Sequence, residues 1–299
     1  MSETLYYDKP VLLNREKHRN RRIRPSTGFG FARSANSVYL AGVEFAEACK
    51  EYAIVFTKLA GSKVAPVVVL GLRNRENLFI DAEERWTAAY VPAFVRRYPF
   101  VLAELPGEQM GVCIDEAFPG VNDAEGDALF DEKGANTPFL QNALEFLTRF
   151  QQEYVRTQAF CEKLEQAGLL SQMSARADLV DGRRFTVEGL MVVDEKKLQA
   201  LPDEMALSLF RTGELHLVSM HLLSLSNMGR LVDRIAQRGA DTGTLPAAAK
   251  TASAPGAGAK PATQAQQPKP PAAAPAAAKA ASPAPATAPR GARGGTKTG

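Results

Sequence analysis

The sequence predicts an α+β fold, with antiparallel sheet regions and segregated helices, followed by a disordered C-terminal tail. Short β-branched and aromatic runs lie close together in residues 52–81 and 100–115, as in antiparallel meanders and hairpins. From Thr137 the apolar residues instead recur at spacings of three or four, which is typical of a helix. Residues 245–299 contain no aromatic residue and consist almost entirely of Ala, Pro, Gly, Ser, Thr, Gln and Lys. Two separate β regions followed by helices favour the α+β class.

Composition divides the chain into a globular domain, residues 1–240, and the tail, residues 245–299. Such a tail cannot bury enough apolar area to offset its ordering entropy, so we expect disorder. It carries seven basic residues and no acid. Because the formal net charge of the chain is +3, residues 1–244 sum to −4. We expect the tail to act as a tether or as an electrostatic contact to an anionic surface.

The sequence predicts a soluble, cytoplasmic protein. Its beginning, MSETLYYDKPVLLNREK, lacks the apolar core of a secretory signal. The longest strongly apolar run, residues 64–72, is about half of a membrane span. The cysteines, Cys49, Cys113 and Cys161, are far apart and form no CxxC motif, which fits a reducing compartment.

Residues 15–25, REKHRNRRIRP, form a basic cluster that allows two interpretations. Nucleic-acid or phosphate binding is one. The other is a solvated connector whose arginines pair with acids of the body, since no aromatic residue for base stacking lies within the cluster. The basic patch consists of Arg15, Lys17, Arg19, Arg21, Arg22 and Arg24.

Residues 43–81 predict a short helix and an antiparallel meander. Residues 43–52 alternate apolar and charged positions at helical spacing, and residues 52–56 and 64–72 are β-branched and aromatic. Residues 73–76 are a polar turn, and residues 77–81 are predicted as a third strand.

Residues 85–100, RWTAAYVPAFVRRYPF, hold the only tryptophan of the chain. A helix would place Trp86, Tyr90 and Phe94 on one face. Aromatic residues with arginines are typical of interface hot spots, but an aromatic stripe at helical spacing also fits a packed core. Pro92 suits the first turn of a short helix that Pro99 stops. The candidate partner-binding residues are Trp86, Tyr90, Arg96, Arg97 and Tyr98.

The remaining elements follow in order along the chain. Thr137-Pro138 is a favourable N-cap and first helical pair, and Gly168 is the expected stop of the longest helix. Asp181-Gly182 is a strong hairpin turn signal. The predicted elements are strands at 100–105 and 110–115, an acidic loop at 116–134, a hairpin at 176–194, and helices at 195–201, 202–210 and 214–231.

No motif in the sequence points to a metal or a cofactor. His216 and His221 are five apart, about 140° around a helix, and so cannot share one ion. The acidic loop resembles a calcium-binding loop, but Val121 stands at the first position, which requires a carboxylate. In GFGFAR, Arg33 stands at the position of the third glycine of a dinucleotide fingerprint. We therefore expect no cofactor and no metal.

An enzyme is an alternative. Carboxylates such as Asp115 and Glu116 could act with Arg96 or Arg97, but adjacent strand residues point to opposite faces. A concave pocket lined by these groups would favour an enzyme or a small-ligand-binding protein, whereas a flat aromatic patch would favour a protein partner.

Several segments closely resemble, in this order, the bacterial SapC family. They include PVLLNREKHRNRRI, VYLAGVEFAEACKEYAIVF, LGLRNRENLFID and RWTAAYVPAFVRRYPF, then GVCIDE, EGDALFDEKG and GLMVVDEKKLQALPDE followed by GELHLVSMHLLSLSNM. The resemblance covers roughly residues 8–232 and excludes the tail. It implies a link to surface layers and the cell envelope, but no catalytic residues that could be carried over. Some members are labelled peptide transporter permeases, which the composition contradicts because nothing here could span a bilayer.

Together these observations favour a soluble, non-enzymatic protein that binds a protein or peptide partner in surface-layer or envelope assembly. Nucleic-acid binding through residues 15–24 and the tail is a further alternative, although seven charges over a long tail provide little affinity.

Overall fold

Antiparallel strands and helices make up the described chain, which confirms the predicted α+β class. The predicted tail, residues 245–299, and the predicted Asp181-Gly182 turn lie outside the described residues. The computed structural model describes residues 6–26, 28–59, 63–105, 109–178 and 184–241.

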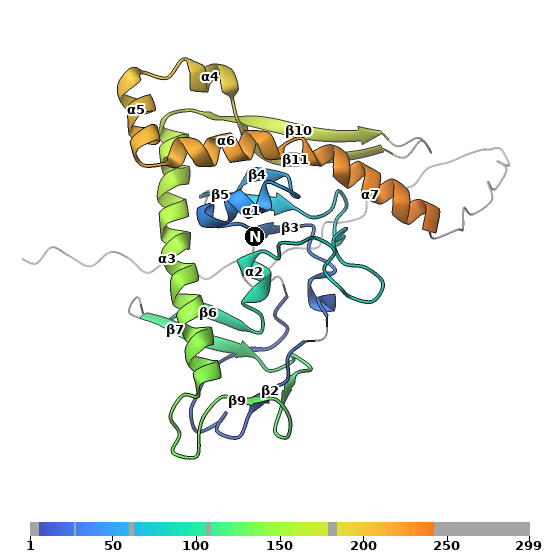
Figure 1. The fold of residues 1–299 in the computed structure, drawn as a ribbon, viewed down its shortest axis with the longest axis vertical. Coiled ribbons are helices and arrows are strands. Elements are labelled where there is room, and N and C mark those ends of the chain that lie inside the picture. The colour runs from blue at the N-terminus through green and yellow to red at the C-terminus, as the bar shows by residue number, and fades with distance from the viewer. Residues whose placement is uncertain (1–5, 27, 60–62, 106–108, 179–183, 242–299) are drawn as a thin grey trace, which may run out of the picture. The chain divides into compact units, whose positions relative to one another are not determined.

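Antiparallel pairing joins the described strands into three sheets (Figure 1). The strands are β1 (Pro10–Leu12), β2 (Arg22–Ile23), β3 (Ser37–Tyr39), β4 (Ile54–Lys58), β5 (Val64–Val69), β6 (Phe100–Leu105), β7 (Gln109–Asp115), β8 (Val121–Asn122), β9 (Asp127–Ala128), β10 (Leu170–Asp178) and β11 (Arg184–Val193). The largest sheet has five strands in the order β10-β11-β4-β5-β3, and the other two have three strands each, β1-β7-β6 and β8-β2-β9.

Helices pack against these sheets. The α-helices are α1 (Phe45–Ala48), α2 (Ala93–Arg96), α3 (Pro138–Gln166), α4 (Glu195–Gln199), α5 (Asp203–Arg211), α6 (Glu214–Ser224) and α7 (Asn227–Asp241), and the 3₁₀ turns are η1 (Gly30–Ala32) and η2 (Gly42–Glu44). The predicted helix at 43–52 is thus shorter than expected and begins as the 3₁₀ turn η2. No helix within the described ranges has the length and apolar character needed to cross a membrane.

The predicted hairpin β6–β7 is confirmed, as is the pairing of β4 with β5. The predicted third strand of the meander, residues 77–81, is wrong. The Asn77 side chain accepts from the Phe79 N–H at 2.9 Å, and the pairing described for this segment is a single isolated bridge between Ile80 and Trp86. Strand β3 pairs with β5 instead.

Helix α3 begins and ends close to the predicted residues. The Thr137 hydroxyl accepts from the Leu140 N–H at 3.3 Å, Pro138 is the first helical residue, and Gly168 follows the helix with a φ of +63°. The helix is continuous and runs alongside both β4–β5 and β6–β7 (Figure 1).

Two hydrophobic clusters pack against helix α3. Phe150, Phe160 and Leu164 belong to the larger cluster, which includes the five-stranded sheet. Leu140 and Leu147 belong to a smaller cluster with side chains of β2, β6 and β7. One helix therefore supports both clusters, and the clusters meet along its N-terminal half.

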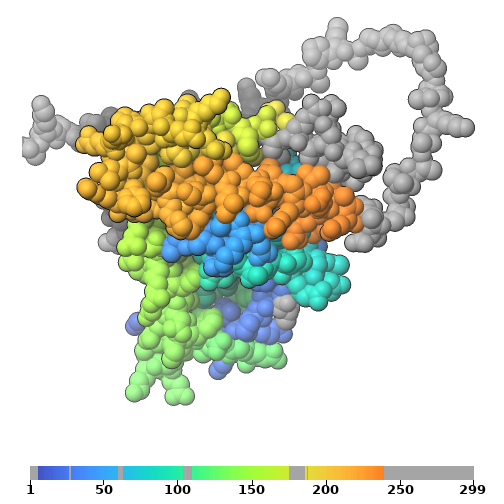
Figure 2. Space-filling view, turned by 45° about the horizontal axis from the view of Figure 1, so that its top comes forward, coloured from blue at the N-terminus to red at the C-terminus, as the bar shows by residue number. Residues whose placement is uncertain are grey.

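The predicted final helix, residues 214–231, is two helices, α6 and α7. The buried Ser224 hydroxyl accepts from the Ile54 N–H at 2.9 Å, and the Asn227 amide donates to the Tyr52 carbonyl at 2.9 Å. These bonds hold the chain to the start of β4 at the point where the helix is interrupted. Figure 2 shows the helices after residue 195 as a continuous yellow-to-orange band across one face.

His221 joins helix α6 to the five-stranded sheet. Its Nδ1 lies 2.8 Å from the Ile54 carbonyl oxygen, and its Nε2 accepts from the Val193 N–H at 3.0 Å. Both nitrogens are therefore used when the ring is neutral with its proton on Nδ1. Burial lowers the pKa of His221 from 6.5 to about 4.

We predict that stability falls between pH 6.5 and about pH 4 because of His221. In this range the unfolded chain takes up a proton that the folded protein does not. Above pH 6.5 the His221 ring is neutral in both states, so its burial does not reduce the free energy of unfolding. As the pH falls to about 4, the free energy of unfolding decreases by about 3 kcal/mol. Urea unfolding at several pH values measures this slope.

His216 provides the matched control, because it lies exposed on the same helix. His221→Gln should flatten the pH dependence of the unfolding free energy, and His216→Gln should leave it as in the wild type. Equal slopes for the two variants would contradict the assignment.

Candidate functional site

The aromatic and arginine stretch is not one helical surface. Residues 85–92 are irregular and only α2 is helical, so Trp86, Tyr90 and Phe94 do not share a helix face. Trp86 stacks on Phe79 with ring centroids 6.4 Å apart, and its Nε1 donates to the Tyr52 hydroxyl at 2.7 Å. Trp86 therefore packs as part of the body.

Tyr90 anchors the start of α2. Its hydroxyl donates to Glu44 Oε1 at 2.7 Å, and the Ala93 N–H donates to the same oxygen at 2.7 Å. Glu44 is only 5% exposed, and burial raises its pKa. The Arg96 guanidinium lies 5.7 Å from the Tyr90 ring centroid, and its Nε donates to the Val91 carbonyl at 2.9 Å.

Tyr98 lies where the two hydrophobic clusters meet. Its ring stacks on Phe31 with centroids 4.2 Å apart, and it contacts Phe118 edge-on at 5.3 Å. Its hydroxyl donates to Asp115 Oδ2 at 3.2 Å. The fully buried Asp115 also accepts from the Lys9 N–H at 2.9 Å, so this carboxylate fastens the N-terminal segment.

Arg97 is the buried cation at this junction. It is 4% exposed, and its guanidinium carbon lies 4.0 Å from the Phe94 ring centroid and 5.0 Å from that of Phe150. Its Nε and Nη2 are buried without a hydrogen-bond partner. The nearby Tyr6 hydroxyl also lacks a partner, and burial raises the pKa of Tyr6. Within the described ranges, no carboxylate lies within 4.0 Å of the Arg97 nitrogens.

A cavity of about 500 Å³ lies beside these residues, and we call it the aromatic cavity. Three segments and Phe118 line it, the segments being residues 23–31, residues 95–100 and the first turns of α3. It is lined by Ile23, Pro25, Ser26, Gly28, Phe29, Phe31, Val95, Arg96, Arg97, Tyr98, Pro99, Phe100, Phe118, Phe139, Asn142, Ala143, Phe146 and Leu147.

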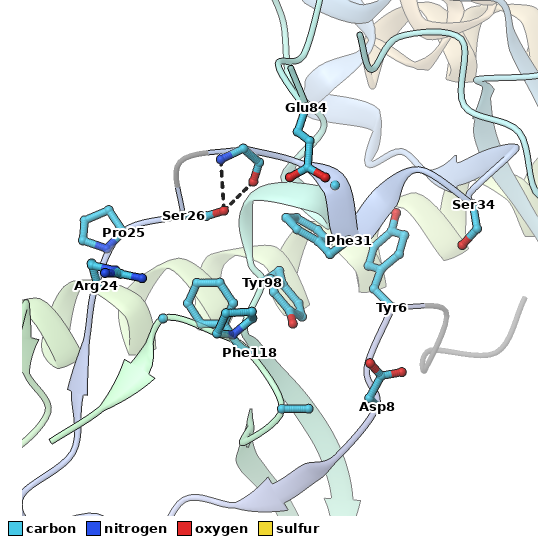
Figure 3. Close-up of a pocket in the computed structure, with 15 residues that line it drawn as sticks. Tyr6, Asp8, Arg24, Pro25, Ser26, Phe31, Ser34, Glu84, Tyr98 and Phe118 are labelled. Carbon is cyan, nitrogen blue, oxygen red and sulfur yellow. Dashed lines mark hydrogen bonds between the residues drawn. The ribbon is translucent and has the colours of Figure 1, made fainter. Parts of the chain in front are cut away.

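A second cavity of about 550 Å³, the polar cavity, adjoins the first (Figure 3). It differs in its lining, which includes Asp8, Arg24, Ser34 and Glu84. Figure 3 shows Phe31, Tyr98 and Phe118 gathered between Pro25 and Tyr6, with Glu84 above them. The residues that line both cavities are Pro25, Ser26, Gly28, Phe31, Tyr98 and Phe118.

In the GFGF segment, the close approach of Glu84 explains the glycine at position 28. A Cβ on Gly28 would lie 2.8 Å from the Glu84 Cβ, and one on Gly30 would overlap its carboxylate. Glu84 itself has a φ of +63°, unusual for a residue with a side chain, and its carbonyl accepts from the Phe29 N–H at 2.7 Å. Gly28 thus serves packing at the cavity wall, whereas the Glu84 carboxylate beside Gly30 is the flexible end of a side chain and can move aside.

The structure brings together only part of the predicted contact set. Arg96, Arg97 and Tyr98 line the aromatic cavity, whereas Trp86 and Tyr90 lie outside its lining. The sequence did not identify Phe31, Phe118 or Phe146 as site residues. No local signal marks them, because Phe31 lies in the short turn η1, Phe118 lies in an irregular segment, and Phe146 is one of several apolar residues along α3.

The basic patch faces the acidic loop. Arg21 pairs with Asp123 at 3.1 Å and Arg24 with Glu125 at 3.6 Å. Lys17 pairs with Glu116 at 2.7 Å. Arg19 and Arg22 donate to the carbonyl oxygens of Glu132 and Gly126 at 2.6 and 2.8 Å. Because these basic side chains already have partners in the chain, they are less available to bind the phosphates of a nucleic acid. Arg15 packs beside Gly134.

The predicted carboxylate and arginine site does not assemble. Neither Asp115 nor Glu116 lines the aromatic cavity. Glu116 instead pairs with Lys9 and Lys17, and these lysines lower its pKa to about 2. No group of three or more His, Cys, Asp or Glu within the described ranges is arranged to hold a metal ion.

Comparison with known proteins points to a family for this chain. A sequence model of the SapC family matches residues 13–231, which are most of the chain. No curated protein and no solved structure matches.

We predict that Arg97→Met preserves or raises the stability of the ligand-free protein. Two buried N–H groups without partners oppose folding by about 1–3 kcal/mol each, whereas stacking of the cation on two rings returns about 2 kcal/mol. Methionine keeps the apolar contacts without the charge. Denaturant unfolding of protein refolded without ligands measures the difference.

Arg97→Ala is the comparison variant. It removes the charge and also leaves a void, so it should destabilise by about 2–4 kcal/mol. A loss of that size in Arg97→Met would show instead that the folded chain itself satisfies the guanidinium.

Proposed function

The chain belongs to the SapC family, and on this premise we propose that it is a non-enzymatic protein that binds a peptide or a segment of a partner protein in the aromatic cavity. The link of the family to surface layers suggests a partner from surface-layer or envelope assembly. The observation that carries the proposal is the cavity itself, since its volume of about 500 Å³ is in the range of ligand sites.

The lining of the aromatic cavity supports binding. Phe31 of η1 and Phe139 and Phe146 of α3 supply apolar surface, and Arg96 and Arg97 supply positive charge. Aromatic and arginine side chains are those that dominate binding energy at interfaces. The described lining includes no His, Cys, Lys, Asp or Glu, so its chemistry favours holding a ligand over transferring protons.

Pre-organisation is a second argument. Tyr98 is fixed by stacking on Phe31 and by its bond to Asp115, and α2 is fixed by Glu44. Binding to a wall that is already ordered requires little further loss of side-chain entropy.

The proposal predicts that filling the cavity abolishes peptide binding. Ala143 lies on α3 in the cavity lining, so Ala143→Trp should occupy the space that a ligand side chain needs. Peptides are selected from a random displayed library on the wild-type protein, synthesised with a fluorescent label and measured by anisotropy. We expect at least about a tenfold loss of affinity in the variant, which corresponds to about 1.4 kcal/mol.

Ala159→Trp is the matched control. Ala159 is exposed on the same helix, about 24 Å further along its axis. This variant should bind the selected peptides as the wild type does. Failure to enrich any peptide, or equal losses in the two variants, would refute binding in the aromatic cavity.

A further inference from the structure

Arg97 carries a buried positive charge that has no counter-charge among the described residues. A buried ion without a counter-charge opposes folding strongly, whereas a buried pair with good geometry does not. Arg97 is 4% exposed and its Nε and Nη2 have no hydrogen-bond partner. Guanidinium N–H groups of this kind are suited to a carboxylate, which accepts two parallel bonds.

The buried carboxylates nearby are already engaged. Asp115 accepts from the backbone of Lys9 and Ala117 and from the Tyr98 hydroxyl. Glu44 accepts from the backbone of Ala41 and Ala93 and from the Tyr90 hydroxyl. Each carboxylate therefore has a structural role in the chain, and neither pairs with Arg97.

We propose that the aromatic cavity recognises a carboxylate joined to an apolar group, with the carboxylate on Arg97 and the apolar group among Phe31, Phe139 and Phe146. The inference rests on the proposed function and deepens it. The peptide ligand would be one with a free C-terminal carboxylate and an apolar last residue.

The charge balance favours a carboxylate over a phosphate. One guanidinium neutralises one negative charge, whereas a phosphate monoester carries about −1.5 to −2 at neutral pH. Arg96 is exposed, and its Nε already donates to the Val91 carbonyl. The apolar walls would leave the remaining charge of a phosphate poorly solvated.

Two probe pairs test the inference on the full-length chain after refolding. The first is a labelled peptide of sequence Gly-Ser-Gly-Ser-Phe, made with a free C-terminal carboxylate and as its amide. The second is 3-phenylpropionate and its neutral amide, which separate a free acid from a peptide end. Affinities are measured by anisotropy for the peptides and by calorimetry for the small molecules.

We expect at least one carboxylate probe to bind about 30-fold or more tightly than its amide. Arg97→Met should remove this preference, and Arg97→Lys should keep part of it, since the charge remains without the planar fork. Arg149→Met, which removes an exposed arginine of α3 outside the cavity lining, should keep it fully. Thermal melting shows that each variant is folded.

The failures of the two proposals are distinguishable. Equal binding of acid and amide, or a preference that survives in Arg97→Met, would overturn carboxylate recognition while leaving peptide binding intact. Binding of 3-phenylpropionate alone, dependent on Arg97, would support the inference and count against a peptide ligand. Absence of binding by both carboxylates would overturn the inference.

A further variant tests an internal counter-charge. Glu3 is an acid of the N-terminal residues, which lie outside the described ranges. Glu3→Gln should leave the preference for the carboxylate unchanged. If carboxylate binding occurred only in this variant, the site would be filled by the chain's own acid and the inference would be overturned.

Discussion

Helix α3 packs against both hydrophobic clusters, and this shared support determines where the other elements lie. Its C-terminal half contacts the five-stranded sheet, and its N-terminal half covers β6 and β7. The chain must cross from one cluster to the other over a short distance between Phe94 and Phe100. Arg97 and Tyr98 lie in that crossing, so a cation and a hydroxyl are buried where apolar packing is interrupted. The aromatic cavity lies at the same junction.

The proposed binding at this junction would come at the expense of its stability. Two aromatic rings stack on the Arg97 cation, but that gain of about 2 kcal/mol is smaller than the several kcal/mol lost when an ion leaves water unpaired. Sites with strained or unsatisfied groups often sacrifice stability for function. By contrast, the buried carboxylates of Asp115 and Glu44 both accept hydrogen bonds from backbone N–H groups.

Local signals explain what the sequence predicted well. The cap at Thr137-Pro138 and the glycine at 168 set the bounds of α3, because caps act within one turn. Residues 77–81 have strand-like composition, but the Asn77 side chain satisfies the local backbone, which no composition reveals. The site was only partly predictable for a related reason. Arg97 and Tyr98 stand in a conspicuous segment, whereas their neighbours from residues 23–31 and α3 reach them only through tertiary packing.

The contacts of the N-terminal segment have a consequence for assembly during translation. Tyr7 donates to the Phe100 carbonyl, and β1 pairs with β7, so the earliest described residues depend on partners made about 100 residues later. At ribosomal speeds of about 5–20 residues per second, strand β7, the pairing partner of β1, is synthesised about 5–20 s after β1. During that interval the neighbouring Tyr6 and Tyr7, which are each 6% exposed in the folded chain, remain uncovered, so chaperones that recognise nascent chains can bind this segment.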